Sequence, residues 1–574
     1  MLTIPLSIMS KIVSLQEDHS KSSLYSHDLA PVPADQRTWN TWHLAALWVG
    51  MAVCIPTYLL ASYMMRSGLG WVETLLIIGL ANAIITIPMV LNGHAGVKYG
   101  IPFPVLGRSS FGTKGIHLPA IVRGIVACGW FGIQTWIGGL ALYSIFTVVT
   151  GMPPTAGLST GKFVGFAAFW LLNMYFVWKG TESIKWLEQL SAPILLAGGL
   201  LLIYWGTVQT GSFGKVLDQS KTLAIPTASL VYDQQGTWIE LHPLQKKDGS
   251  GYRPEAVQIL LPGKTDPAQS VWTPMQERIK VSDDKIAAAS VIFKANIQGK
   301  EVLSSTLEAK PLVTESGGWW SKLGKYLFWL TAMVGFWATM SLSIADITRY
   351  AKSQRSQVYG QFLGLPLTMM LFSFVGVFVT CAAMINFEDI LIGDDAPWDP
   401  VNLMAKFEHP WVVVVAQIFM IVATLTTNIA ANVIAPANAF SNLLPRKISF
   451  KTGGLITGVI GILICPWLLL NEISSLLLFV SGLLGPVLGI MLCDYYAIRK
   501  TNLDLDAMYD EKGQFAYGGS GYNPAALIAA AAGVGLALVG YWVPQLDFLY
   551  TASWFTGFFV SFVLYYFLMK KQKR

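Results

Sequence analysis

The sequence Met51-Ala52-Val53-Cys54-Ile55-Pro56-Thr57-Tyr58 stands near the middle of an apolar run over residues 41–65. Proline has no backbone N–H, so Pro56 cannot donate to the hydrogen-bond ladder of a helix, and a carbonyl oxygen one turn earlier is left free. Within a lipid bilayer, free backbone groups persist only where protein or a watery cavity supplies their partners. The stretch therefore predicts a membrane helix that is interrupted beside a cavity.

A second interruption, Val334-Gly335-Phe336-Trp337-Ala338-Thr339, occurs in a later apolar run over residues 324–347. The two runs are the first and the sixth along the chain, which are corresponding places if the first ten runs form two halves of five helices. Matched breaks in two halves are the best sequence indication of a transporter site. The alternative is a pair of simple kinks, because proline and glycine are common in membrane helices.

The composition of the whole chain indicates that lipid is its solvent. Hydrophobic residues make up 53% of the 574 residues and charged residues only 13%, whereas a soluble domain carries about 25% charged residues. The net charge of +6 comes from basic residues that are scattered among short loops. This pattern indicates membrane topology and argues against a nucleic-acid partner.

Twelve apolar runs approach the length of about 20 residues that a helix needs to cross the hydrocarbon core. They cover residues 41–65, 72–91, 117–149, 162–179, 184–208, 324–347, 356–385, 410–440, 453–471, 474–497, 524–543 and 548–569. The sequence thus predicts an all-α polytopic membrane protein. Its two five-helix halves occupy residues 41–208 and 323–497, and the last two helices and a basic tail occupy residues 524–574.

Charges in the loops predict the orientation in the membrane. One set of alternate loops is basic and includes Lys98, Arg108 and Arg349, while the opposite set includes an acidic loop over residues 388–399. Basic loops remain on the cytoplasmic side. Both termini, with residues 1–40 and the loop 498–523, are therefore expected in the cytoplasm, and the protein in the plasma or inner membrane.

Residues 209–322 separate the fifth and sixth runs and contain no apolar stretch long enough to cross a membrane. Alternating apolar residues and turn signals predict β-strands here. The expected strands are 228–232, 238–241, 256–261, 290–297 and 300–307, the last two joined by Gln298-Gly299. The prediction is a small extracellular or periplasmic β-rich insertion rather than a disordered linker. Its role is open, and an unknown ligand or partner is one candidate.

Polar side chains inside two apolar runs are candidates for a binding site. The eighth run contains Thr426, Thr427, Asn428 and Asn432, and the two amides are four residues apart on one helix face. In the third run, Trp130 lies one turn from Gln134. An aromatic plate beside an amide suits a flat heterocycle with N–H and C=O groups at its edge. The alternatives are amides that join helices and a tryptophan that faces lipid.

Few ionisable residues lie inside the apolar runs. Glu188 and Asp346 are candidates for proton handling, because buried charge is costly in a membrane. Interfacial ion pairs with Lys185 and Arg349 are the favoured interpretation. The seven histidines show no metal-ligand spacing, and the sequence has no nucleophile–base arrangement. Neither an enzyme nor a bound cofactor is therefore expected.

Several motifs occur together in order along the chain. They are Asp28-Leu29-Ala30-Pro31, Arg37-Thr38-Trp39, Ile55-Pro56-Thr57-Tyr58, Asn92-Gly93-His94-Ala95-Gly96, Tyr99-Gly100-Ile101-Pro102-Phe103-Pro104-Val105, Trp130-Phe131-Gly132-Ile133-Gln134-Thr135, Asp346-Ile347-Thr348-Arg349-Tyr350 and Asn428-Ile429-Ala430-Ala431-Asn432. With them the chain resembles the hydantoin, allantoin, cytosine and uracil permease branch of the nucleobase:cation symporters. That family has a LeuT-like fold with an inverted repeat of five plus five helices, followed by two more. The insertion departs from the family pattern.

The resemblance implies a transporter that takes up a small planar nitrogen heterocycle by alternating access, coupled to a cation. The implied substrate residues are two aromatic plates, two amides and the backbone of the sixth helix: Trp130, Trp337, Gln134, Asn432, Gly335 and Phe336. The implied sodium site has three carbonyls and two hydroxyls, from Ala52, Ile55, Ala423, Thr426 and Thr427. Five oxygens suit a hard cation.

Some alternatives remain open at this point. Some relatives couple to protons, so the threonine pair favours Na⁺ as the coupling ion without excluding a proton-coupled permease for a vitamin-like ring. A membrane-embedded sensor that uses the same pocket is a further possibility, as is an intramembrane enzyme that acts on the heterocycle. Nucleobases, allantoin, hydantoins and vitamin-like rings all offer similar edges to such a site.

Overall fold

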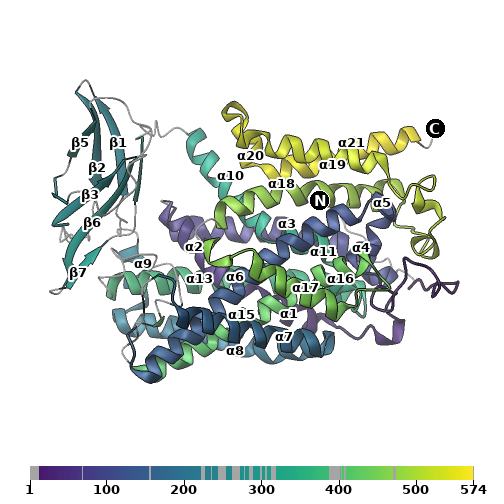
Figure 1. Cartoon of the computed structure of the whole chain (residues 1–574), viewed down its shortest axis with the longest axis horizontal. Helices are drawn as coiled ribbons and strands as arrows, with labels where there is room; N and C mark the ends of the chain where they lie inside the picture. Colours follow the sequence, from purple (N-terminus) through teal and green to yellow (C-terminus); the bar gives the residue numbers. More distant parts are fainter. Residues whose placement is uncertain are drawn as a thin grey trace.

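The computed structural model is a bundle of long helices with a β-sheet at one end (Figure 1). It describes residues 12–572 apart from 68, 154, 156, 221–226, 234, 243–253, 262–271, 277, 283–288, 298–299, 304–306, 312–318, 387–400, 402–403, 406, 408 and 470–472. The helices run side by side along the bundle, and the C-terminal end of the chain lies at the end opposite the sheet.

The first apolar run is broken, as predicted. Helix α1 (Thr41–Ala52) and helix α2 (Ile55–Arg66) meet at an angle of 57°. An asparagine and a histidine form a capping box at the start of α1, and Cys54 is extended between the helices. Pro56 lies in the first turn of α2, where a missing N–H costs nothing. The break therefore lies at Val53 and Cys54, before the proline, because Pro56 belongs to the first turn of the second helix.

The other apolar runs also form helices. They are α3 (Trp71–Tyr99), α6 (His117–Thr150), α7 (Thr160–Lys179), α8 (Thr181–Thr210), α10 (Trp319–Phe336), α13 (Gln354–Asn386), α15 (Pro410–Asn432), α17 (Phe450–Leu463), α18 (Ile473–Leu492), α19 (Pro524–Leu538) and α21 (Ser553–Gln572). Within the described residues, ten helices are long and apolar enough to span a membrane, and the bent pair α1 and α2 makes eleven. The predicted ninth span is the exception, because α17 has only 14 residues.

The interruption of the sixth run is smaller than that of the first. Helix α10 ends at Phe336, and α11 (Ala338–Ser343) begins after Trp337, whose backbone is not helical. Residues 322–343 nevertheless continue in one direction as a single candidate span. The sixth run therefore shows a one-residue step at Trp337, not the predicted break at the glycine. A comparable step at Val433 separates α15 from α16 (Ile434–Leu443).

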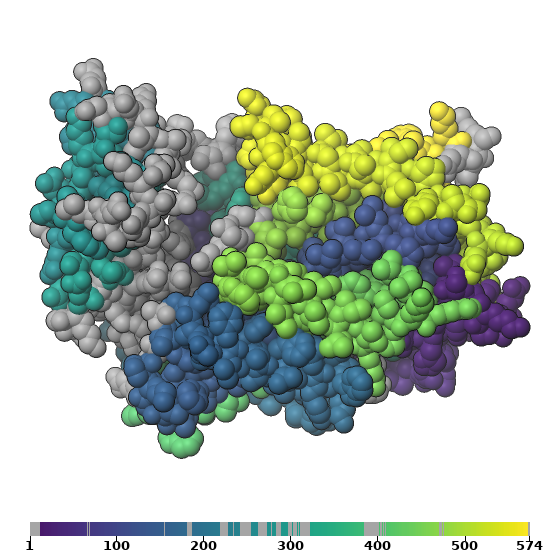
Figure 2. Space-filling view, in the orientation of Figure 1, coloured from purple at the N-terminus to yellow at the C-terminus, as the bar shows by residue number. Residues whose placement is uncertain are grey.

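The outer surface of the bundle is apolar. Large side chains such as Leu76 on α3, Trp178 on α7 and Leu200 on α8 are more than half exposed. A soluble protein would bury such side chains, whereas a bilayer accepts them. The space-filling view shows the last helices, in yellow, along one edge of the bundle (Figure 2). Composition, helix length and this exterior together establish a multi-pass membrane protein.

The insertion forms a β-sheet with its own buried residues. Its strands are β1 (Thr227–Asp233), β2 (Gly236–His242), β3 (Ala256–Leu260), β4 (Thr273–Pro274), β5 (Arg278–Ser282), β6 (Ala289–Ile297), β7 (Lys300–Leu303) and β8 (Leu307–Pro311), in the order β4-β3-β6-β8-β1-β2-β5 with β7 on β6. Leu230, Ile239 and Val257 are fully buried. Four of the five predicted strands are confirmed, and β7, with the pairing of Ile297 and Lys300, confirms the start of the fifth. Residues 304–306 of the predicted strand 300–307 lie outside the described residues, and β8 starts at Leu307.

Candidate functional site

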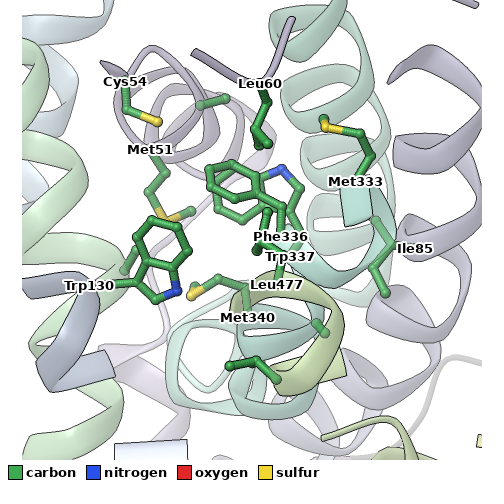
Figure 3. Packing of buried hydrophobic residues seen from close by; sticks show 14 of the residues in the cluster. Met51, Cys54, Leu60, Ile85, Trp130, Met333, Phe336, Trp337, Met340 and Leu477 are labelled. Carbon is green, nitrogen blue, oxygen red and sulfur yellow. The ribbon is translucent and has the colours of Figure 1, made fainter. Parts of the chain in front are cut away.

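Aromatic side chains from three helices meet near the two helix breaks. Trp130 on α6 contacts Phe336 at the end of α10, with ring centroids 5.7 Å apart, and Phe336 contacts Trp337 at 4.9 Å. Trp48 on α1 packs edge-on against Trp337 at 5.2 Å. Figure 3 shows Trp130, Phe336 and Trp337, with Met51 of α1 nearby. Trp130 is 7% and Trp337 3% exposed, so neither faces lipid.

The two tryptophans do not stack on each other, because Phe336 contacts both of them edge-on. The sequence predicted that the backbone of Phe336 binds the substrate, but it gave no role to Trp48. Trp48 is only one of several aromatic residues in its apolar run. The structure thus gathers Trp48, Trp130, Phe336 and Trp337 into one group, which we call the aromatic cluster. Gly335 lies in the last turn of α10 next to it.

Two polar atoms at the aromatic cluster have no hydrogen-bond partner among the described residues. They are Oε1 of Gln134, which lies one turn from Trp130 on α6, and Nε1 of Trp337. Both residues are buried. An unsatisfied polar atom in an apolar setting costs about 1–3 kcal/mol, so native proteins retain few of them. An acceptor and a donor left free at one aromatic site are what a heterocycle with N–H and C=O groups would satisfy.

The two amides of the eighth run differ in what they contact. Asn428 Nδ2 lies 3.1 Å from Thr135 Oγ1 on α6 and 3.1 Å from Asn173 Oδ1 on α7, so this amide joins helices. Asn432 Nδ2 donates to Asn428 Oδ1 at 3.2 Å. Asn428 therefore joins helices, as the alternative interpretation held. The side chain of Asn432 is oriented by its hydrogen bond to Asn428. Asn173 was missed, although an asparagine within the fourth apolar run is itself a signal.

The two threonine hydroxyls lie where α15 meets the end of α1. Thr426 Oγ1 is 3.0 Å from the carbonyl oxygens of both Gly50 and Ala423. Thr427 Oγ1 is 3.0 Å from Gly50 O, 3.2 Å from Met51 O and 2.9 Å from Ala423 O. Gly50 and Met51 are among the last four residues of α1, whose carbonyls lack helical partners. The break thus aims free carbonyl oxygens at the threonine pair.

The chemistry of this oxygen cluster fits a hard cation. Each hydroxyl has one hydrogen but faces at least two carbonyl oxygens, so acceptors outnumber donors. Neutral oxygens in excess are suitable ligands for a hard cation. Of the five expected ligands, Ala423, Thr426 and Thr427 come together here. Ala52 ends α1 and Ile55 begins α2, so these two flank the break, while the contacts of Gly50 were not anticipated.

The favoured interpretation of the ionisable residues as ion pairs is wrong for Asp346. Its Oδ1 accepts hydrogen bonds from the backbone N–H of Phe103 at 2.9 Å and from Asn438 Nδ2 at 3.0 Å. Arg349 donates instead to the backbone carbonyls of Asp28 and Ala30. Asp346 is thus held inside the bundle by neutral donors, because the arginine reaches the N-terminal segment.

Glu188 is buried in α8, and neither oxygen of its carboxyl has a hydrogen-bond partner among the described residues. The side chain of Lys185, its expected partner, lies outside the described residues. In the described part of the chain, no group of three or more His, Cys, Asp or Glu side chains is arranged to hold a metal ion. The candidate cation site is thus of the neutral-oxygen type.

A cavity of about 350 Å³ lies elsewhere, near the ends of α6 and α7. Its lining includes Tyr143, Thr147 and Lys162 but none of the expected substrate residues. The rings of the aromatic cluster contact one another. A flat ring stacked between Trp130 and Trp337 would therefore displace Phe336, which contacts both.

Three comparisons with known proteins agree. A family model described as "Permease for cytosine/purines, uracil, thiamine, allantoin" matches residues 31–243 and 286–564, on either side of a stretch within the insertion. The allantoin permease of Bacillus subtilis is 31% identical over 571 residues, covering 97% of this chain and 96% of that protein. The purine-uracil permease of Arabidopsis thaliana is 33% identical over 530 residues, covering 90% of this chain and 72% of that protein.

Among solved structures, a nucleobase-cation-symport-1 family transporter in a closed conformation with bromovinylhydantoin bound superposes with a TM-score of 0.68 at 22% identity, and 96% of each chain is covered. A Na⁺-coupled sialic acid symporter in an outward-open state gives a TM-score of 0.54 at 12% identity, with 93% of this chain and 90% of that chain covered. These likenesses establish the LeuT-like fold of the bundle.

Proposed function

Because this chain belongs to the nucleobase:cation symporter family of permeases, we propose that it takes up a small planar nitrogen heterocycle by sodium-coupled alternating access. The family and the relatives establish a transporter of the nucleobase, allantoin or hydantoin type rather than an enzyme. The coupling ion, the transport cycle and the residues that bind the substrate are parts of the proposal.

The substrate ring lies between the tryptophans of the aromatic cluster in this proposal. Trp130 and Trp337 cover its faces, and Phe336 moves aside to admit it. Gln134 Oε1 accepts a hydrogen bond from a ring N–H, and Trp337 Nε1 donates to a ring carbonyl. Asn432 and the backbone at Gly335 complete the polar edge. The observation that carries this proposal is the pair of buried, unpartnered polar atoms at the aromatic cluster.

Sodium binds to the oxygen cluster between α1 and α15. The hydroxyls of Thr426 and Thr427 turn their lone pairs toward the ion, and the carbonyl of Ala423 faces it from the same helix. Carbonyl oxygens at the break, from Ala52 and Ile55 or from the neighbouring Gly50, provide the remaining ligands. The ion therefore fixes the broken segment of the first span, which also carries Trp48, the partner of Trp337. Cation and substrate stabilise each other through this segment.

The proposed orientation places both termini in the cytoplasm and the β-sheet outside the cell. Basic loops and the basic tail support this side as cytoplasmic. The position of the sheet, at the end of the bundle opposite the C-terminal end of α21, agrees with it (Figure 1).

The purified protein tests this proposal in a binding screen. Its melting temperature is measured with uracil, cytosine, allantoin, a hydantoin and thiamine, each with sodium and with choline in its place. We expect at least one heterocycle to raise the melting temperature, and to do so more strongly with sodium, because ligands of the native state stabilise it. Equal shifts in sodium and choline would contradict sodium coupling, and no shift with any compound would contradict the substrate class.

A further inference from the structure

Arg123 is a charged residue buried inside the helix bundle. It lies in the spanning part of α6, is 1% exposed, and makes no ion pair with another described residue. A cation is costly at membrane depth, and one that is retained there marks a place of function. The bonds of this guanidinium therefore indicate what it does.

The guanidinium joins three helices through neutral oxygens. Its Nε donates to the backbone oxygen of Thr339 on α11 at 2.8 Å and to Ser343 Oγ at 3.3 Å. Its Nη2 donates to the backbone oxygen of Ala431 on α15 at 3.3 Å. A planar guanidinium presents donors in more than one direction. One side chain of α6 thereby holds a carbonyl group of α11 and a carbonyl group of α15.

Both carbonyl groups lie at steps in their helices. Thr339 is the second residue of α11, which begins after the non-helical backbone of Trp337. Ala431 is the last residue but one of α15, which ends before the step at Val433. The last carbonyl oxygens of a helix have no partner within that helix, so a side chain from another helix supplies the donor here. Arg123 therefore bonds to the backbone where these two helices are interrupted.

The proposed substrate residues are next to these bonds. Trp337 lies two residues before the carbonyl group on α11, and Asn432 directly follows the carbonyl group on α15. Trp130 and Gln134 lie seven and eleven residues after the arginine on α6, and these spacings place all three on one helix face. The arginine thus connects the helix that carries one pair of substrate residues to the backbone that carries the other pair.

We propose that Arg123 is a positioning residue for the substrate. Its two backbone bonds hold Trp337 and Asn432 at the distance from α6 at which they reach the same ring as Trp130 and Gln134. This inference rests on the proposed function. A site whose residues are held in place before binding loses less entropy when the ligand arrives, and it therefore binds more tightly.

Arg108 provides a matched control. It is also buried, and its guanidinium donates to the backbone oxygens of Met508 and Leu24 and to Asn442 Oδ1. None of these three acceptors is next to a proposed substrate residue or sodium ligand in the sequence. Removal of Arg108 therefore takes comparable bonds from the bundle and leaves the two helix steps as they are.

Isothermal titration of the purified, full-length protein with the heterocycle selected by the binding screen, at saturating sodium, tests the proposal. Arg123→Gln removes the two-directional donor, and Arg123→Lys keeps the charge but offers one nitrogen for two carbonyl groups. Both variants should raise the Kd for the heterocycle by about tenfold, because the site must then be ordered on binding. The Kd for ²²Na⁺, measured without heterocycle, should remain that of the wild type. Arg108→Gln should leave both constants unchanged.

Hydrogen–deuterium exchange without substrate gives a second measurement. In Arg123→Gln, exchange should rise in peptides that cover residues 336–343 and 429–436, and it should match the wild type in α19 and α21, because only the two steps lose their donor. An arginine with a merely structural role would instead lower the melting temperature without this local pattern.

The outcomes separate this inference from the proposed function. A wild-type Kd for the heterocycle in both Arg123 variants, or an equal rise in Arg108→Gln, would overturn the role of Arg123 while transport stands. If neither Arg123 variant folds, the inference is also overturned, because the arginine then holds the whole bundle rather than the two steps. If the wild type binds no heterocycle of the screen, the proposed substrate class fails, and exchange at the two steps still decides whether Arg123 holds them.

Discussion

Gln134 is the residue whose environment says most about the substrate. Its buried Oε1 atom has no described partner, although it lies one turn from Trp130 in the aromatic cluster. Such an atom is retained against its energetic cost where a ligand supplies the missing donor. The substrate is therefore expected to present an N–H group at the edge of a flat ring.

Gln134→Ala should weaken binding of the heterocycle identified in the screen by about 10- to 100-fold, an effect of about 1–3 kcal/mol for one lost hydrogen bond. Isothermal titration of the purified protein measures it. Gln417→Ala is the matched control, because Gln417 on α15 is also buried with an unpartnered Oε1 but donates to the carbonyl of Val401, outside the aromatic cluster. Equal losses in both variants would remove Gln134 from the site.

Thr427→Ala should raise the sodium concentration that half-saturates binding by about tenfold, which corresponds to about 1.4 kcal/mol. The reason is that its hydroxyl joins the end of α1 to α15 in the oxygen cluster. Substrate binding at several sodium concentrations measures the effect. Thr424→Ala, on the same helix, should bind sodium normally, because that hydroxyl only donates to the carbonyl of Met420. A normal sodium response in Thr427→Ala would exclude the hydroxyl as a ligand.

At the scale of elements, close packing of α6 against α17 depends on a glycine. A Cβ atom on Gly132 would collide with the backbone oxygen of Gly461, which cannot move aside as a flexible side chain would. Gly129, one turn earlier on α6, has no described atom within 4 Å of the corresponding position. The two positions therefore separate the effect of steric overlap from the general effect of alanine in a helix.

Gly132→Ala should lower the melting temperature in detergent, because an overpacked contact costs about 1–3 kcal/mol. Gly129→Ala should leave the melting temperature unchanged or raise it slightly, since alanine favours a helix by about 1 kcal/mol over glycine. Differential scanning fluorimetry compares the two. A Gly132→Ala protein as stable as the wild type would contradict the packing of α6 against α17.

The sequence predicted elements better than contacts. Apolar runs gave the helices and alternation gave the strands, because both patterns are local. The exact break did not follow from Pro56, since proline also begins helices. The ninth span was overestimated because its apolar run continues past Leu463 into a short turn. The packing of Glu188 against Gly50 could not be predicted, because nothing in the local sequence of either residue indicates it.

At the scale of the whole molecule, the β-sheet and the basic loops should face opposite sides of the membrane. Glu301 on β7 and Lys512 in the loop before α19 are both exposed and provide a test. In intact cells, a membrane-impermeant thiol reagent should label Glu301→Cys, whereas Lys512→Cys should be labelled only after lysis. Four of the five native cysteines are buried, which keeps the background low. The reverse pattern would invert the proposed topology.

The proposed account joins three features of the molecule: a broken first span, an aromatic cluster with polar atoms that have no described partner, and an oxygen cluster between α1 and α15. The broken span packs against α8 and α15, and its Trp48 contacts Trp337 of the aromatic cluster. The cation and the ring therefore both bind to the broken first span. Their binding is coupled because each stabilises the same arrangement of that span.

The most direct test is accumulation of a radiolabelled heterocycle, the one selected by the binding screen, in proteoliposomes with an inward sodium gradient. We expect unchanged compound to accumulate above its external concentration, to equilibrate without a gradient, and to show no uptake in Trp130→Ala liposomes. Binding without accumulation, or accumulation that is the same with and without the sodium gradient, would contradict the account.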